Sequence, residues 1–140
     1  MAYSGRFVPK NPSKYLGDPT GIIYRSLWER RVMVYLDDNT TVLEWSSEEI
    51  VIPYISPVDN RYHRYFPDFF VRTKDGAMIL EVKPLSQSVA PKQKKRVTKQ
   101  YINEVMTYGV NQAKWNAAVE YCKDRGWKFK VITEKDLGIK

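Results

Sequence analysis

Two extended apolar segments joined by an Asp-Gly turn constrain the fold of this chain more than any other feature. The first segment covers residues 65–71 and the second covers residues 77–83, with the charged connection 72–76 between them. An Asp-Gly pair between β-branched and aromatic runs is a strong short-range signal for a β-hairpin. The sequence therefore predicts two antiparallel strands at the centre of the fold.

Charged residues stand in this hairpin where the inner face of a strand is expected to stay apolar. Glu81 and Lys83 share one face of the second strand because side chains alternate along it. The hairpin brings Asp68, near the start of the first strand, to the same end of the sheet. Mg²⁺ prefers oxygen ligands and is often held by one or two carboxylates. We therefore predict a metal site at Asp68 and Glu81, with the Val82 carbonyl as a further ligand.

The spacing of these residues resembles the motif of the PD-(D/E)xK nucleases. It consists here of Pro67-Asp68, the intervening residues 69–80, and then Glu81-Val82-Lys83. The short form of this motif is weakly specific by itself. The assignment is strengthened by the flanking strands, the turn and a third acidic residue upstream.

Composition narrows the class of protein. The chain has 140 residues, which predicts a single domain spanning 1–140. Its net charge of +7 favours a polyanionic partner, nucleic acid first and an anionic membrane second. No apolar run approaches the roughly 20 residues of a membrane helix, and we expect no membrane association. The single cysteine, Cys122, excludes an internal disulfide and fits a reducing compartment.

The N-terminal region, about 1–20, is polar and rich in proline, which disfavours a helix. We predict an extended arm whose Arg6, Lys10 and Lys14 are available to phosphates or to a partner. A loosely docked tail is an equally good interpretation.

A first helix is predicted over residues 22–37 from its apolar periodicity. Ser26 to Glu29 has the form of a capping box, which is one interpretation of Glu29. The other is that Glu29, near the start of a helix preceding the sheet, supplies one more carboxylate beside the metal.

The central sheet is predicted as a meander of strands at 42–45, 50–55, 62–71 and 77–83. Glu48 and Glu49 are expected to be solvated acids between two strands, with a role as metal ligands as the less favoured alternative. Arg64 is expected to contact the substrate. For His63, substrate contact and a solvated position at the end of the strand are equally good interpretations.

The region 84–99 is predicted to be a basic loop whose cations meet DNA phosphates. These are Lys92, Lys94, Lys95, Arg96 and Lys99. A helix is expected to follow as far as Val110, then a second one, 112–125, capped by Asn111 and burying Trp115 and Cys122. A last strand, 127–133, is expected beside the hairpin and parallel to it.

Longer motifs along the chain carry a more specific likeness. They are Met1 to Tyr15, Tyr24-Arg-Ser-Leu-Trp-Glu29, Val51 to Tyr54, Arg64 to Asp68, Glu81 to Pro84, and Lys128 to Glu134. Through these motifs the chain resembles the head completion nucleases of T-even-type tailed phages. More distantly, the chain is similar to TnsA-type transposition endonucleases and phage junction resolvases.

This resemblance implies an α/β, restriction-endonuclease-like fold with a central mixed β-sheet flanked by helices. It implies Mg²⁺-dependent DNA endonuclease activity, with exonuclease character as an option and Mn²⁺ as a substitute. The catalytic set that it carries over is Glu29, Asp68, Glu81 and Lys83. Because no base-reading motif is visible, we expect weak sequence specificity.

The resemblance also implies a role in head completion before tail joining. The expected partners are phage head, portal or neck proteins. The expected location is the cytoplasm of the infected bacterium, or the virion at the head–tail junction. Two alternatives stay open: a non-catalytic connector that binds DNA ends, and a structure-selective junction resolvase.

Overall fold

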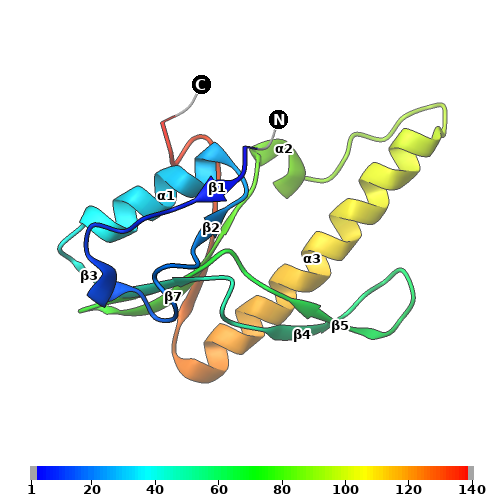
Figure 1. Ribbon diagram of the computed structural model, residues 1–140. Helices are drawn as coiled ribbons and strands as arrows, with labels where there is room; N and C mark the ends of the chain where they lie inside the picture. Colours follow the sequence, from blue (N-terminus) through cyan, green and yellow to red (C-terminus); the bar gives the residue numbers. More distant parts are fainter. Residues whose placement is uncertain (1–2, 139–140) are drawn as a thin grey trace.

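A four-stranded mixed sheet organises the computed structural model, which describes residues 3–138 (Figure 1). Across the sheet the strands are β3 (Val42–Ser47), β6 (Phe69–Thr73), β7 (Gly76–Val82) and β8 (Lys128–Ile132). β6 and β7 form the predicted antiparallel hairpin, and β8 runs parallel to β7 as expected. Gly76 has a φ of 133°, a conformation that only glycine adopts readily, which explains the Asp-Gly turn.

Side-chain alternation along β7 divides the interior into two cores. Leu80 and Val82 pack on the side of α1 (Leu27–Asp38), whereas Ala77 and Ile79 pack on the side of α3 (Lys99–Arg125). Glu81 continues the second series and is 4% exposed. The predicted α/β class, a mixed sheet flanked by helices, is confirmed.

Helix α1 begins later than its periodicity suggests. Ser26 is its N-cap, and its hydroxyl accepts a hydrogen bond from the Glu29 N–H at 3.1 Å. The expected start at residue 22 is wrong, because β2 (Ile23–Tyr24) pairs there with β1 (Gly5–Arg6). Strand pairing with a segment distant in sequence outweighs the local helical pattern at these residues.

Helix α3 is a single helix, whereas two were predicted. Thr98 caps it by accepting a hydrogen bond from the Tyr101 N–H, and Gly126 ends it with a φ of 73°. Asn111, expected to start a second helix, is buried within it. The expected inward side chains Trp115 and Cys122 are buried, as predicted.

Strands β4 (Ile52–Ile55) and β5 (Tyr62–Tyr65) form a separate two-stranded ribbon, not part of the central meander. The predicted four-strand meander is therefore wrong, and the predicted strand 62–71 is two strands, divided around Pro67. Proline has no N–H for a ladder, and its ring limits the preceding residue, so the chain can change direction here. The ribbon packs on α3 through Tyr54 and Tyr65, and Figure 1 shows it beside that helix.

The N-terminal arm belongs to the core of the protein. Phe7 and Tyr15 are buried, with ring centroids 5.9 and 4.8 Å from that of Trp45. The Lys14 ammonium donates hydrogen bonds of 2.8 and 2.9 Å to the carbonyls of Asp37 and Asn39. The prediction that Lys14 is available to phosphates is therefore wrong, because its ammonium satisfies the C-terminal carbonyls of α1. A 3₁₀ turn, η1 (Pro12–Lys14), shapes this contact.

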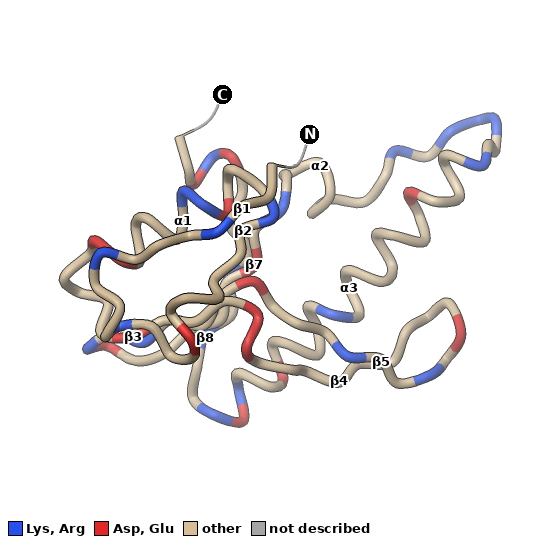
Figure 2. Tube along the Cα trace, viewed as in Figure 1, with Lys and Arg blue, Asp and Glu red and all other residues tan. Residues whose placement is uncertain are grey.

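The segment after the hairpin holds one short helix, α2 (Leu85–Ser88), and no regular structure from Val89 to Val97. Figure 2 shows a concentration of lysine and arginine where this segment turns into the first residues of α3. The described helices include none with both the length and the apolar character needed to cross a membrane.

Candidate active site

The hairpin brings Asp68 and Glu81 together at one end of the sheet. The Val82 N–H donates a 2.7 Å hydrogen bond to Asp68 Oδ2, and the Asp68 N–H donates a 3.3 Å bond to Glu81 Oε1. Pro67 ends the preceding segment, so that Asp68 stands just outside β6. The predicted meeting of these two carboxylates is confirmed.

The carboxylate pair is electrostatically strained. Restricted access to water raises the pKa of Asp68 well above its usual value, and the adjacent Glu81 carboxylate raises it further. The Val82 N–H opposes this effect, whereas the Glu29 carboxylate adds to it. A buried carboxyl beside a second carboxylate is a favourable place for a bound cation.

The Glu29 carboxylate lies close enough to raise the pKa of Asp68, but it forms no hydrogen bond with Asp68 or Glu81 in the described structure. Its side chain accepts hydrogen bonds from the Arg25 N–H at 3.4 Å and the Ser26 hydroxyl at 3.3 Å, so it closes back on the start of α1 through the residue before the N-cap. Burial raises its pKa. In the described residues, no group of three or more His, Cys, Asp or Glu side chains is placed to hold a metal ion. The prediction that Glu29 is a ligand stays a prediction.

An ion pair between Arg25 and Glu48 borders the site. Arg25 Nε and Nη2 each lie 3.1 Å from an oxygen of Glu48. Glu48 has a φ of 56°, and its N–H donates to the Asp68 carbonyl at 3.2 Å. The expectation that Glu48 is only a solvated acid is wrong. No local pattern links two side chains 23 residues apart, so the sequence carried no signal for this pair.

Lys83 follows directly after β7, and its N–H donates to the Ile132 carbonyl at 2.9 Å. It lines a cavity of about 470 Å³ together with residues of α3, including Lys114. It therefore lies on the same side of the sheet as Glu81, as alternation predicts.

Tyr65 and Trp115 enclose Glu81, although nothing in the sequence pattern indicates that either belongs to the site. Trp115 Nε1 lies 3.5 Å from Glu81 Oε2, which is the long limit of a hydrogen bond. The Tyr65 hydroxyl is buried and has no hydrogen-bond partner among the described residues. Burial and the Glu81 charge raise its pKa. Both aromatic residues look like core positions in sequence, so only the fold could show that their polar atoms adjoin the carboxylates.

The predicted DNA-binding residues are scattered over the structure. Arg64 is exposed on β5 and its guanidinium lies 5.9 Å from the Phe66 ring centroid. Lys92, Lys94, Lys95 and Arg96 are exposed on the segment before α3. Nε2 of His63 lies 2.8 Å from Asp59, a residue of its own ribbon turn, which favours the solvated interpretation.

Two further predicted cations, Arg6 and Lys10, belong to the N-terminal arm. Arg6 is exposed on β1. The Lys10 N–H donates to Asp37 at 2.8 Å, near the C-terminal end of α1. Asp37 and Glu29 lie about 12 Å apart along the axis of this helix, at 1.5 Å per residue. The structure therefore does not bring Lys10 to the carboxylate end of the sheet.

Residues 39–134 match the family described as TnsA-like endonuclease N terminal. The chain belongs to this family. The matched range runs from β3 to β8 and includes Asp68, Glu81 and Lys83, but it begins after Glu29. The fold is accordingly restriction-endonuclease-like, and membership supports a nuclease.

The likeness to one relative extends beyond that range. The "Head completion nuclease" of Enterobacteria phage T4 is 41% identical over 142 aligned positions. The alignment covers 98% of this chain and 95% of that protein, so it includes the arm and α1. The predicted resemblance to phage head completion nucleases is confirmed.

Proposed function

We propose that this protein is a divalent-metal-dependent DNA endonuclease of the PD-(D/E)xK type. The observation that carries the proposal is the Asp68–Glu81 pair, held by the 2.7 Å bond from Val82 and followed two residues later by Lys83. Family membership supports nuclease activity, and the +7 charge supports a nucleic acid substrate.

The donor set fits a magnesium ion. Two carboxylates are the usual protein contribution to a Mg²⁺ site, in which waters and substrate oxygens complete the coordination. The raised pKa of Asp68 and the unpartnered Tyr65 hydroxyl both indicate a site with unmet polar interactions. Asp68 and Glu81 would hold the ion, with the Val82 carbonyl as a further oxygen and Glu29 as an outer carboxylate. Mn²⁺ should substitute.

The side chains divide the work of phosphodiester hydrolysis between them. A bound divalent ion would polarise the phosphate and make water more acidic. The Val82 N–H holds the Asp68 carboxylate, and the Asp68 N–H donates to Glu81, which orients both carboxylates before substrate arrives. The Lys83 ammonium orients the attacking water and stabilises the negative charge that develops on the phosphate. Exposed cations such as Arg64 and Arg96 bind the DNA backbone without reading its sequence.

The test is cleavage of supercoiled plasmid DNA by the wild type, Asp68→Ala and the control Asp38→Ala, which removes an exposed carboxylate from the far end of α1. We expect nicking in Mg²⁺ or Mn²⁺ and none in EDTA. Asp68→Ala should lose at least about a hundredfold in rate while staying folded, because charge stabilisation of this kind is worth that much. Full activity in Asp68→Ala would contradict the site.

The likeness to the phage T4 protein supports a more specific setting. We propose that the substrate is phage DNA and that cleavage takes part in completing the head before tail joining. Head, portal or neck proteins are then the partners, in the infected cell or at the head–tail junction. A phage carrying Asp68→Ala should accumulate heads without tails. DNA binding with no cleavage in any metal would instead favour the non-catalytic connector.

A further inference from the structure

A groove follows α3 outward from Lys114 and begins at Lys83, two residues after Glu81. Its inner part, about 470 Å³, begins at Lys83 and Lys114. Its outer part is a cavity of about 730 Å³. Gln87, Asn103 and Thr107 line both parts, so the two are continuous, and we call them together the α3 groove.

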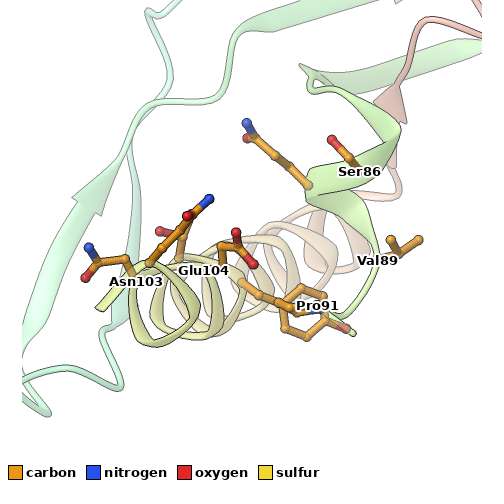
Figure 3. Close-up of a pocket in the computed structure, with 9 residues that line it drawn as sticks. Ser86, Val89, Pro91, Asn103 and Glu104 are labelled. Atoms are coloured by element: carbon orange, nitrogen blue, oxygen red, sulfur yellow. The ribbon is translucent and has the colours of Figure 1, made fainter. Parts of the chain in front are cut away.

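The outer part lies between α3 and the segment that follows the hairpin. Figure 3 shows Ser86 and Val89 on one side, with Asn103 and Glu104 across the open space from them. The groove therefore leads from the proposed reaction site along α3 toward the basic segment before it.

The inner end of the groove is positively charged and preorganised. The Lys114 ammonium lies 5.9 and 5.7 Å from the ring centroids of Tyr54 and Tyr65. Contacts of this length between a cation and aromatic rings are attractive and restrain the lysine. Lys83 and Lys114 thus place two cations in one cavity at the end of β7, where a phosphate next to the cleaved one would lie.

Farther out the lining is polar, with Glu104 as its charged member, and suits nucleotide bases. Asn103, Thr107 and Gln87 offer hydrogen-bond donors and acceptors, and Tyr108 offers an aromatic ring. Among the described lining residues Glu104 carries a negative charge, and its carboxylate lies 3.9 Å from the Lys94 ammonium. Cations along a path with an aromatic ring are typical of sites for single-stranded nucleic acid.

The dimensions favour one strand over a duplex. Cavities of this volume hold ligands of drug size, whereas the major groove of duplex DNA alone admits a whole α-helix. From Asn103 to Lys114 the helix rises about 16 Å, enough for roughly five nucleotides of one strand at 3.4 Å each.

We propose that the α3 groove binds a single-stranded segment of the substrate strand next to the phosphate that is cleaved. Resting on the proposed nuclease function, this inference defines the substrate class as DNA with a single-stranded end or flank. Lys114 holds the phosphate adjacent to the reaction site, and the uncharged middle of the groove holds the bases that follow.

The first test measures binding in EDTA by fluorescence anisotropy, with a labelled oligo(dT) of about twelve nucleotides and a blunt hairpin duplex as probes. Asn103→Glu places a negative charge in the groove, and Asn116→Glu places the same charge on the same helix at an exposed position outside it. We expect Asn103→Glu to weaken oligo(dT) binding about fivefold and Asn116→Glu to change it less than about twofold. Equal effects of the two substitutions would overturn the proposal.

Salt dependence tests Lys114 separately. Lys114→Gln should lower the slope of log affinity for oligo(dT) against log salt by about 0.7, the value for one phosphate contact on a single strand. An unchanged slope would show that Lys114 does not contact a phosphate of the bound strand.

The second test measures kcat/KM in Mg²⁺ on a blunt duplex and on the same duplex with a 5′ or a 3′ single-stranded overhang. The wild type and Asn116→Glu should prefer one of the overhangs at least about fivefold, and Asn103→Glu should bring the ratio toward one. Cleavage of all three substrates at one rate would overturn the proposed role of the α3 groove while leaving the proposed nuclease function in place. Selective oligo(dT) binding without any cleavage would leave the groove and overturn the nuclease.

Discussion

The C-terminal half of α3 has four buried residues. Its N-terminal half, Lys99 to Val110, lies wholly within the described part of the chain and has none. The buried half packs on the sheet and places Trp115 beside Glu81. The other half exposes Ile102, Val105 and Met106 at 46, 43 and 44% and borders the α3 groove. One continuous helix therefore packs beside Glu81 with its C-terminal half and offers a surface to the substrate with its N-terminal half. Core packing restricts substitutions in the buried half more than in the exposed half.

The largest effect should come from the buried half. Trp115→Ala removes a 7% exposed ring from the core and should lower the free energy of unfolding by about 3–5 kcal/mol, measured in urea. Met106→Ala, in the other half, should cost less than about 1 kcal/mol. Trp115→Phe keeps most of the packing without the N–H. A similar loss of stability in Met106→Ala would contradict the contrast between the two halves.

Replacing Asp68 by asparagine should stabilise the metal-free protein while abolishing cleavage. Because the folded state raises the pKa of Asp68, its ionised form is disfavoured on folding, and this penalty grows as pH rises through that pKa. The free energy of unfolding in EDTA at pH 7 should therefore rise by about 1–2 kcal/mol, as when other strained active-site groups are removed. The gain should shrink toward pH 4.

The control for this prediction is Asp38→Asn, which removes a charge far from the pair and should leave stability nearly unchanged. Added Mg²⁺ should raise the melting temperature of the wild type and not that of Asp68→Asn. Destabilisation of Asp68→Asn at pH 7 would show that the pair is not strained.

A smaller gain is expected at Gly109, near the junction of the two halves. An added Cβ would meet the Pro57 side chain at 3.8 Å, an ordinary contact. Gly109→Ala should therefore stabilise the protein by about 0.5–1 kcal/mol, because alanine is the better helix former. The measurement is the urea midpoint. A decrease in stability would mean that the helix needs flexibility there.

The smallest effect on stability is expected in the basic segment before α3. Joint replacement of Lys95 and Arg96 by glutamine should change the free energy of unfolding by less than about 0.5 kcal/mol, since both are exposed. The same variant should lower the salt slope of duplex DNA binding by about 0.9 for each phosphate that it no longer neutralises. Replacing the exposed Lys123 and Lys135 instead is the control for net charge, and a matching change there would exclude a specific role for the segment.

The sequence was most informative where neighbouring residues decide the conformation. The Asp-Gly turn and the alternation around it predict the hairpin, and the hairpin brings Asp68 to Glu81 and Val82. The Ser26 cap is a signal of the same local kind. These features depend on backbone geometry over a few residues, which a single chain displays directly.

Only the tertiary structure decided how distant segments meet. Pro67 marks a break, but packing against α3 turns β4 and β5 away from the sheet. The Arg25–Glu48 pair, the Tyr65 hydroxyl beside Glu81, and the shared cavity of Lys83 and Lys114 join residues from separate elements. Such contacts follow from how whole faces are buried, so no local pattern contains them, whereas the carboxylate pair was already determined by one turn and the alternation of two strands.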